Sequence, residues 1–579
     1  MLFGAALLLL AGLATVAWVG ADAVRARDEL RSAAVQIDAL RDQVQRGDLQ
    51  RAAPTLTALK HHAAAAFDLT HGPRWSAVAA LPWLGRSVRA VQTVSEVADG
   101  LATGALPALV GTAAHVDPAA LVPRNGRVDL APLREGGPAV IAADVQVQDA
   151  VRRVDSVDRD GLLPAVSSPL SVLRSQLDSL ALTTATAARA VRLLPPMLGA
   201  DGPRSYLVLV QNNAEQRATG GVPTLVRLRV VAGQVEIAET RSATGRLAHL
   251  PRPILPLTPA EQSLFGEGLG TYLGNVTSTP DFPRSAKLAR AIWRQRAGTD
   301  LDGVLSIDPG GLANLLAVTG PVKLTTGGVL TAGNAAGMLM NAVYLKLLDP
   351  AEQDRFFAAT AVTVFSALSD GRGNPSELIA ALGKSAREGR LMVWSAHQDE
   401  QALLSGTMLS GELVGVHGHA PVVGVFLNDG TAAKIGYYLR TDVVARPTGC
   451  RPDGSQTVHV TVTLTNTLRP ADVASLPPYI SSGILVPKGQ VRTNVLLYAP
   501  AAGQVERVTV RGASEGVLSQ THDGLAVVGK TVQLKPAASV AIDYDIVTGH
   551  DQPDTPVLRV TPVALGSVEV DSSMCARLP

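Results

Sequence analysis

The sequence predicts a multidomain α+β protein with a membrane helix, a helical region, a central three-layer α/β/α domain and a C-terminal all-β domain. The hydrophobic period changes along the chain, from helical spacing to short unbroken apolar runs and then to alternation. The chain has 579 residues, which suits about three or four domains. Because 46% of these residues are hydrophobic, the chain can bury several cores.

The charge balance and the cysteine count exclude two classes of function. The chain carries 51 basic and 50 acidic side chains, for a net charge of +1. This balance leaves no broad basic surface of the kind that nucleic acids need, so no nucleic-acid partner is expected. Two cysteines cannot form a zinc site with four cysteine ligands, and no C-x-x-C or H-x-x-x-H spacing occurs.

The first 21 residues predict a transmembrane anchor. Residues 1–21 carry no charged side chain and would span about 30 Å as a helix, which is the thickness of a bilayer core. A cleaved signal peptide is the alternative, but its apolar region usually has about 7–15 residues. No clear cleavage site precedes Asp22. We therefore expect an uncleaved, single-pass anchor in the cell membrane, with the bulk of the chain extracytoplasmic.

Residues 22–200 predict a helical stalk or bundle. Apolar side chains recur every three or four residues at Ala33, Ile37, Leu40 and Val44, with charged residues between them. No residue pattern in this region points to catalysis. We expect it to hold the rest of the protein away from the membrane.

Residues 201–420 predict the α/β domain. Tyr206–Val210 is a short, unbroken apolar run, which is typical of a strand buried on both faces. Asp281, two residues before Pro283, and Asp308, directly before Pro309, mark helix starts. Strands that alternate with helices favour a three-layer architecture. Further strands are expected at 224–231, 234–238 and 304–307, and helices at 283–296, 332–347, 350–369 and 374–389.

Residues 421–579 predict an immunoglobulin-like β-sandwich. Val458, Val460, Val462 and Leu464 alternate with polar residues, as in a strand with one buried face. Similar stretches recur with glycine and proline turns between them, which favours a sandwich. Cys450 and Cys575 flank this region. Outside the membrane they are expected to form a disulfide, the alternative being two free, small apolar side chains.

The best candidate site follows the strand at 206–210. In open α/β sheets, ligands bind beyond the carboxyl ends of the strands. The segment from Gln211 to Gly221 combines amides, the carboxylate of Glu215, the guanidinium of Arg217 and two glycines that permit a close approach of the backbone. The alternative is a loop network in which Glu215 pairs with Arg217.

Three groups of residues resemble a bacterial family known as domain of unknown function 4012. They are Tyr206–Gly221, then Asp302–Pro309 with Thr319–Val322, and Asn428–Lys434 with Tyr437–Leu439. The anchor, helical region and β tail are also similar to that family's layout, so the resemblance covers nearly the whole chain. It implies membership but no activity.

The order of elements in 201–370 more distantly resembles the LytR-CpsA-Psr proteins. Those membrane-anchored enzymes transfer glycopolymers from a polyprenyl-pyrophosphate carrier to peptidoglycan. The resemblance implies that Arg217, Arg241 and Lys346 hold phosphate, with Arg355 in a following helix. Two positions depart from the family pattern: Thr219 replaces a magnesium-binding Asp, and Lys346 replaces an Arg. Mg²⁺ prefers oxygen ligands, of which Glu215 could supply one.

These observations predict an extracytoplasmic cell-envelope protein that binds a phosphorylated or polyprenyl-pyrophosphate-linked glycan. A role in attaching cell-wall glycopolymers follows from the resemblance; any catalysis would be phosphotransfer, with Mg²⁺ as the candidate cofactor. The alternative is a non-enzymatic envelope scaffold that contacts other envelope proteins and whose central domain is structural. The candidate ligand-binding residues are Gln211, Asn212, Asn213, Glu215, Arg217, Thr219, Gly220, Arg241, Lys346 and Arg355.

Overall fold

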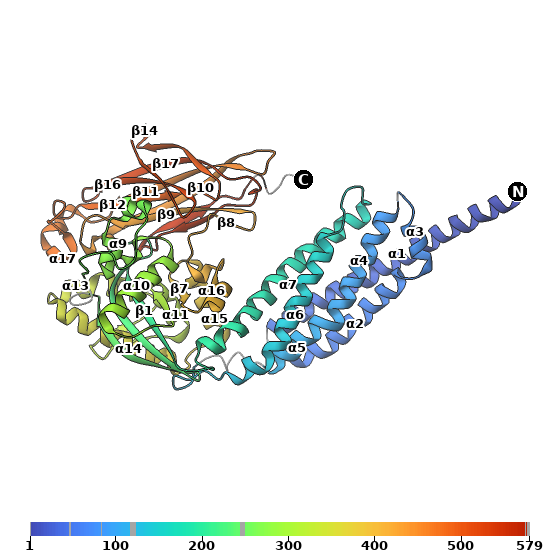
Figure 1. The fold of residues 1–579 in the computed structure, drawn as a ribbon, viewed down its shortest axis with the longest axis horizontal. Coiled ribbons are helices and arrows are strands. Elements are labelled where there is room, and N and C mark those ends of the chain that lie inside the picture. Colours follow the sequence, from blue (N-terminus) through green and yellow to red (C-terminus); the bar gives the residue numbers. More distant parts are fainter. Residues whose placement is uncertain are drawn as a thin grey trace. The chain divides into compact units, whose positions relative to one another are not determined.

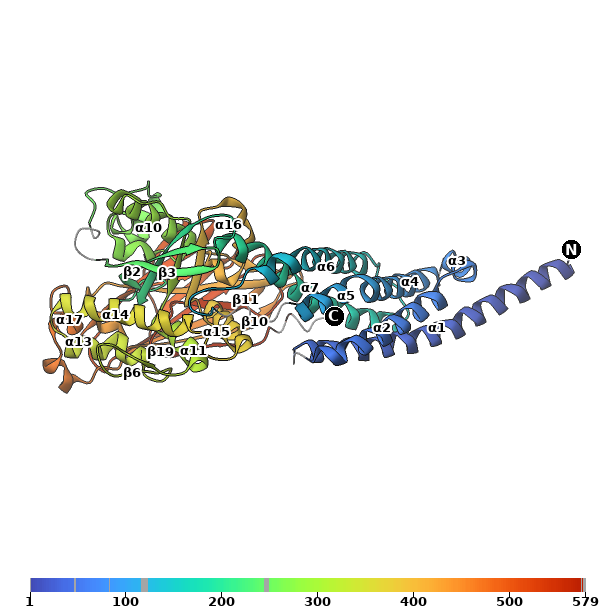
Figure 2. The same ribbon diagram turned by 90° about the horizontal axis from the view of Figure 1, so that it is seen from below.

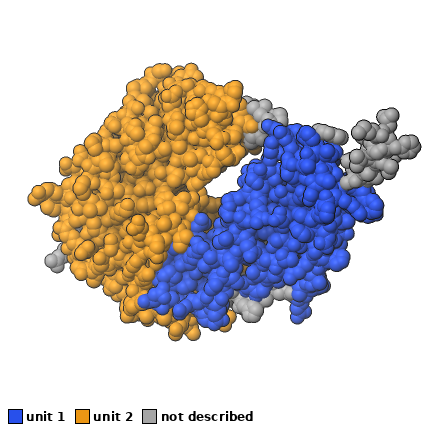
Figure 3. All heavy atoms as spheres, turned by 45° about the vertical axis from the view of Figure 1, so that its right-hand side comes forward, with its two compact units in different colours: residues 1–121, 129–201 blue, residues 122–128, 202–579 orange. Residues whose placement is uncertain are grey.

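The computed structural model is a multidomain α+β protein, as the sequence predicts. It describes residues 2–45, 48–82, 84–115, 123–243, 249–573 and 575, without the side chains of 2–16, 44, 45, 49 and 113–115. The chain forms two compact units, which Figure 3 colours separately. The first unit comprises Met1–Leu121 and Asp129–Asp201, and the second comprises Val122–Val128 and Gly202–Pro579.

The first unit consists of helices (Figure 1), and these pack through small side chains. Ala33 and Leu40 of the first helix are buried against Ala52, Leu59 and Ala63 of the second. Alanine lets helix axes approach closely, which suits an alanine-rich sequence. The helices are α1 (Leu2–Gln45), α2 (Leu49–Thr70), α3 (Pro73–Ala79), α4 (Gly85–Gly100), η1 (Leu101–Ala105), α5 (Leu106–His115), α6 (Ala131–Asp155) and α7 (Pro164–Met197).

The expected membrane anchor, residues 1–21, coincides with the start of α1. Met1 and the side chains of residues 2–16 lie outside the described part of the chain. Across the described residues, no helix combines the length and the apolar character needed to cross a bilayer.

The second unit begins with a five-stranded mixed sheet in the order β3-β2-β1-β4-β7. β1 and β4 are parallel, and the other neighbouring pairs are antiparallel. The expected strands at 206–210, 224–231, 234–238 and 304–307 are confirmed, whereas β7 was not expected. The strands are β1 (Arg204–Asn212), β2 (Gly221–Val231), β3 (Gln234–Ser242), β4 (Gly303–Ile307) and β7 (Leu391–Ser395).

Helices cover both faces of this sheet. Leu207 and Leu209 of β1 belong to a core with Trp293 of α10, whereas Val208 and Val210 point to the opposite face. That side holds α11 and α14, and the alternation follows from the period of two in a strand. The elements are α8 (Pro259–Phe265), α9 (Gly268–Thr271), η4 (Leu273–Ser278), α10 (Phe282–Ala297), α11 (Pro309–Thr319), β5 (Val322–Lys323), β6 (Val329–Leu330), α12 (Ala335–Gly337), η5 (Met338–Ala342), α13 (Val343–Lys346), α14 (Pro350–Ser369), α15 (Pro375–Arg387), α16 (Gln398–Leu404) and η6 (Met408–Ser410).

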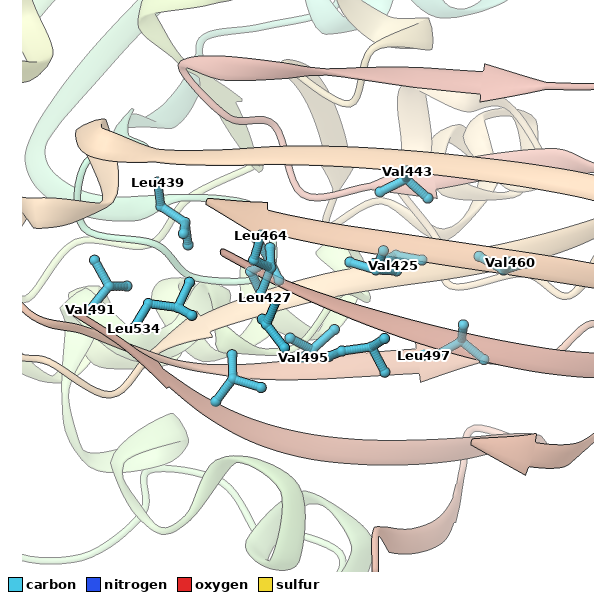
Figure 4. Packing of buried hydrophobic residues seen from close by; sticks show 14 of the residues in the cluster. Val425, Leu427, Leu439, Val443, Val460, Leu464, Val491, Val495, Leu497 and Leu534 are labelled. Atoms are coloured by element: carbon cyan, nitrogen blue, oxygen red, sulfur yellow. The ribbon is translucent and has the colours of Figure 1, made fainter. Parts of the chain in front are cut away.

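The rest of the second unit is built from two sheets that share one core (Figure 4). Val460 and Leu464 of β11 meet Val425 of β9 and Val495 of β12, all fully buried. The alternation at 458–464 therefore predicts the buried face correctly. The elements are β8 (Val416–His417), β9 (Ala420–Asp429), η7 (Lys434–Tyr438), β10 (Leu439–Cys450), β11 (Gln456–Asn466), η8 (Pro470–Ser475), α17 (Pro478–Ser481), β12 (Val491–Tyr498), β13 (Gln504–Val510), β14 (Ala513–Ser514), β15 (Leu518–His522), β16 (Leu525–Leu534), β17 (Ser539–Val547), β18 (Val557–Val560) and β19 (Leu565–Val570).

A disulfide joins Cys450 to Cys575, as expected. It connects the end of β10 to the segment after β19, across a sequence separation of 125 residues. Since the two strands are parallel neighbours, the bond ties the end of the chain to its own sheet.

Candidate functional site

The candidate loop runs from the end of β1 into β2 and is almost entirely buried. Gln211, Asn212 and Asn213 are each at most 2% exposed. Gly220 has a φ of +119°, and a Cβ there would collide with the side chain of Asn213. This backbone conformation suits only glycine. The two glycines therefore serve the close packing of the loop itself.

The amides of the loop bind side chains from other elements. Asn212 Nδ2 donates to the hydroxyl of Tyr344 at 2.6 Å, and Asn213 Nδ2 donates to Asp308 Oδ2 at 2.5 Å. Asp308 also caps α11 by accepting from the Gly311 N–H at 2.6 Å. Arg390 Nη1 completes the set at 2.7 Å from Asp308. These bonds fix the loop beside the first turn of α11.

A buried ion pair holds the tip of the loop. Lys434 Nζ lies 2.8 Å from Glu215 Oε2, and Arg217 Nη2 lies 3.4 Å from Glu215 Oε1. The charge of Lys434, with a smaller effect from Arg217, lowers the pKa of Glu215 to about 2. Burial alone would lower the pKa of Lys434, but the adjacent Glu215 carboxylate raises it. Lys434 also lies 5.0 Å from the ring centre of Tyr344, within cation–π range.

The same loop forms backbone hydrogen bonds to the end of β9 and to the segment after it. Gly436 N donates to Ala214 O at 2.9 Å, and Asp429 N donates to Gln216 O at 2.9 Å. The two stretches 206–221 and 428–439, which carry part of the family resemblance, are therefore in direct contact. The first enters the central sheet, and the second leads into the two-sheet region.

An apolar cavity of about 160 Å³ lies on the α14 face of the central sheet. Gln211, Asn212 and Asp308 line its polar part, so the cavity adjoins the candidate loop. Gln211 Oε1 and Thr360 Oγ1 are buried without a hydrogen-bond partner in the protein. A polar atom left in this state normally costs free energy, which is why such atoms often mark ligand sites. The apolar lining consists mainly of Val208, Val210, Val226, Leu228, Ile237, Ile307, Leu312, Leu339, Phe357, Ala361, Val364, Phe365 and Leu368.

The region that holds the candidate loop also matches a family model. Residues 201–344 match the model of a family described as protein of unknown function (DUF4012). The match supports the DUF4012 resemblance over strands β1 to β4 of the central sheet, the candidate loop and the helices up to Tyr344. The resemblance to the LytR-CpsA-Psr proteins stays a prediction.

No curated protein matches the chain. Among solved structures, the chain is similar to a "putative nutrient binding protein" from Legionella pneumophila, with 13% sequence identity and a TM-score of 0.14. The alignment covers 21% of this chain and 41% of that one. A likeness this slight carries no argument about fold or function.

Within the DUF4012 match, Arg241 lies away from the cavity. Its Nε pairs with Glu239 at 2.6 Å, and its guanidinium lies 5.1 Å from the ring centre of Trp293. Trp293 packs on the α10 face of the sheet, and Arg241 pairs in register with Leu225 of that same core. Arg241 therefore points to the face opposite the cavity.

The other two expected cations lie at the surface. Lys346 is exposed at the end of α13, and Arg355 lies 4.0 Å from Glu352 on α14. Neither makes a hydrogen bond or ion pair to the loop among the described contacts. The structure therefore groups Arg217 with Glu215 but does not bring Arg241, Lys346 and Arg355 to them.

The loop does not supply a good magnesium site. Thr219 accepts a hydrogen bond from Gln211 Nε2 at 3.2 Å, and Glu215 is neutralised by Lys434 and Arg217. Within the described part of the chain, no three His, Cys, Asp or Glu residues are grouped to hold a metal ion. The residues present therefore do not fit the Mg²⁺ that the distant resemblance implies.

Sequence reasoning missed Lys434, Arg390 and Thr360. Lys434 stands in a stretch that resembles DUF4012, and its partner Glu215 is 219 residues away. A lysine that follows a buried strand gives no signal of its own that its charge is buried. Arg390 precedes β7, which was also missed, so its place beside Asp308 could not be inferred.

Proposed function

We propose that this is a membrane-anchored, extracytoplasmic cell-envelope protein whose central domain binds a polyprenyl-pyrophosphate-linked glycan. The observation that carries the proposal is the apolar cavity beside the candidate loop. A dry apolar cavity of about 150 Å³ accepts a molecule the size of benzene. The cavity is thus large enough for about one isoprene unit of a prenyl chain.

The polar part of the cavity suits the head of such a ligand. Gln211 Oε1 accepts hydrogen bonds and is free to meet a sugar hydroxyl. Arg390 and the first turn of α11 lie next to Asp308, and a cation beside a helix N-terminus favours phosphate. The proposal therefore assigns the phosphate to Arg390 rather than to Arg241, and the phosphate would replace the carboxylates of Asp308 and Glu388 as partners of Arg390.

The proposal is for binding, and it includes no catalytic step. Glu215 is paired with both Lys434 and Arg217, and Thr219 is no substitute for a carboxylate ligand. Since the loop offers a metal few free oxygen atoms, phosphotransfer that depends on Mg²⁺ has no support from these residues. Glycan capture that assists attachment to the cell wall remains within the proposal.

The cellular location of the protein and the resemblance of its domains to known folds belong to the same proposal. The disulfide between Cys450 and Cys575 supports an oxidising, extracytoplasmic compartment, and residues 1–21 would be the anchor. The mixed sheet with helices on both faces supports a three-layer domain resembling the LytR-CpsA-Psr fold. The two sheets with one shared core support an immunoglobulin-like sandwich at 421–579.

One observation favours the scaffold alternative. Arg217, Arg241, Arg355 and also Arg390 each pair with a carboxylate of the protein itself, at 3.4, 2.6, 4.0 and 2.7 Å. Side chains that satisfy one another in this way need no phosphate. Under this alternative, the central domain is structural and envelope proteins are the partners.

A cavity-filling substitution tests the proposal. Ala361 lines the cavity, whereas its neighbour Val362 is 46% exposed on the same helix. We expect Ala361→Phe to weaken binding of a polyprenyl pyrophosphate by at least tenfold, which is about 1.4 kcal/mol. Val362→Phe is the matched control and should bind like the parent. The full chain in lipid nanodiscs, titrated with labelled ligand, gives both affinities.

The outcomes separate the two functions. Equal affinity in the two variants would show that the cavity does not bind the ligand. Absence of binding by the parent protein would favour the scaffold. Equal unfolding midpoints in urea for both variants would show that a loss of binding does not reflect misfolding.

A further inference from the structure

Two segments of the second unit expose aliphatic side chains at one edge. Leu348, after α13, is 69% exposed, and Ile484 and Leu485, after α17, are 84% and 52% exposed. Leu345 and Tyr479 add further exposed surface in the same two segments. We call these five side chains the apolar edge patch. In Figures 1 and 2, α13 and α17 lie side by side.

The two segments contact each other through aromatic rings. The ring centres of Tyr344 and Tyr479 are 5.8 Å apart, and Lys434 lies 5.1 Å from that of Tyr479. Tyr344 is 2% exposed, so it fixes the base of the patch within the core. The two segments that carry the five exposed side chains are therefore neighbours.

The loop that carries Ile484 and Leu485 is held in place at both ends. Ser482 Oγ donates to Thr431 O at 3.0 Å, and Gly489 N donates to Ser481 O at 2.8 Å. Val486, directly after the two exposed residues, is 4% exposed. Because its neighbours are anchored, the loop presents Ile484 and Leu485 outward by its own geometry.

The charged side chains in both segments are lysines. Residues 477–490 contain Lys488 and no acidic residue, and residues 343–348 contain Lys346 and no acidic residue. Asp349, the next carboxylate, caps α14 by accepting from the Ala351 N–H at 3.0 Å. Apolar tips between lysines match a membrane surface with anionic headgroups.

We infer that the apolar edge patch docks onto an anionic lipid bilayer. Ile484, Leu485 and Leu348 enter the boundary between headgroups and acyl chains, Tyr479 lies at the interface, and Lys346 and Lys488 meet the headgroups. Amphipathic surfaces with apolar side chains and lysines bind membranes in this orientation.

A bilayer suits this patch better than a protein partner does. A stable protein interface buries about 800 Å² on each side and is anchored by aromatic and arginine side chains. The patch comprises five side chains, most of them aliphatic, and it contains no arginine. Small aliphatic loops gain more from an acyl-chain boundary, which adapts to their shape.

The inference does not depend on glycan binding, but it bears on the cavity. Tyr344, at the base of the patch, lies 5.7 Å from the ring centre of Phe357, which lines the cavity. A bilayer docked at the patch would therefore lie on the α13 side of the cavity.

A label on the patch tests the inference in the full chain. Leu485→Cys, labelled with an environment-sensitive fluorophore, is reconstituted in vesicles of phosphatidylglycerol and phosphatidylcholine with nitroxide-bearing acyl chains. The two native cysteines are joined in the disulfide and do not take the label. Val568→Cys, at 53% exposure on β19, is the matched control.

The expected result is a blue shift and a loss of most emission at Leu485, with neither change at Val568. Substituting both Lys346→Glu and Lys488→Glu should restore the emission, as should vesicles of phosphatidylcholine alone. Unquenched emission at Leu485 would overturn the inference. A blue shift without nitroxide quenching would also overturn it, because the label would then contact protein. The vesicles hold no polyprenyl lipid, so the result is independent of the glycan-binding test.

Discussion

Removing the carboxylate of Glu215 should leave Lys434 as an uncompensated charge. Lys434 keeps 5% of its side-chain surface exposed, and its nitrogen lies 2.8 Å from Glu215. The pKa of Glu215 falls from 4.5 to about 2, and each unit corresponds to about 1.4 kcal/mol. Glu215 keeps 32% of its side-chain surface exposed, so solvent screens part of this electrostatic stabilisation. We therefore expect Glu215→Gln to lower the free energy of unfolding by about 2–3 kcal/mol.

The ion pair between Glu215 and Lys434 should also make the free energy of unfolding depend on pH. A carboxyl group whose folded-state pKa is depressed contributes stability above its unfolded pKa, near 4.5, and loses it as the pH falls toward 2. In Glu215→Gln this component is absent at every pH. The difference between parent and variant should therefore shrink between pH 5 and about pH 2. Urea unfolding curves at several pH values measure it.

Two further variants sharpen this test. Glu352→Gln is the control, since Glu352 is 50% exposed and 4.0 Å from Arg355, and should change stability by less than about 0.5 kcal/mol. Combining Glu215→Gln with Lys434→Met should recover part of the loss, because no buried charge then lacks its partner. A loss of under about 0.5 kcal/mol for Glu215→Gln, with unchanged acid sensitivity, would refute the reasoning.

The disulfide and the loop glycine give two more predictions. Replacing both Cys450 and Cys575 by alanine should cost about 2–4 kcal/mol in urea unfolding, and reductant should then have no further effect on that variant. Gly220→Ala should destabilise by more than about 1 kcal/mol, because φ is +119° and the added Cβ collides with Asn213. Gly100→Ala, where no atom lies within 4 Å of the added Cβ, should instead stabilise α4 by about 0.5–1 kcal/mol.

The strands could be predicted where burial dictates the pattern. The run 206–210 is apolar at every position because helices cover both faces of β1, and the alternation at 458–464 reflects a strand with one buried face. The pairing of Cys450 with Cys575 followed from their places at the two ends of the β region. In each case a local pattern carried the information.

The site was harder, because its contacts join distant residues. The candidate loop was found, yet its charge partner Lys434 is 219 residues away. The face to which Arg241 points depends on its register with Leu225, which no sequence pattern reveals. The cavity arises from the spacing between the sheet and α14, so single residues such as Ala361 give no hint of it.

The contact between the loop and the segment after β9 has a consequence for synthesis. The chain emerges from the ribosome N-terminus first, so the loop at 213–218 appears about two hundred residues before Asp429, Lys434 and Gly436. Until then, Glu215 and the backbone groups of the loop lack the partners that bury them. Completion of the candidate site therefore waits for the start of the C-terminal β region, and a nascent chain that stops earlier would carry an unfinished loop.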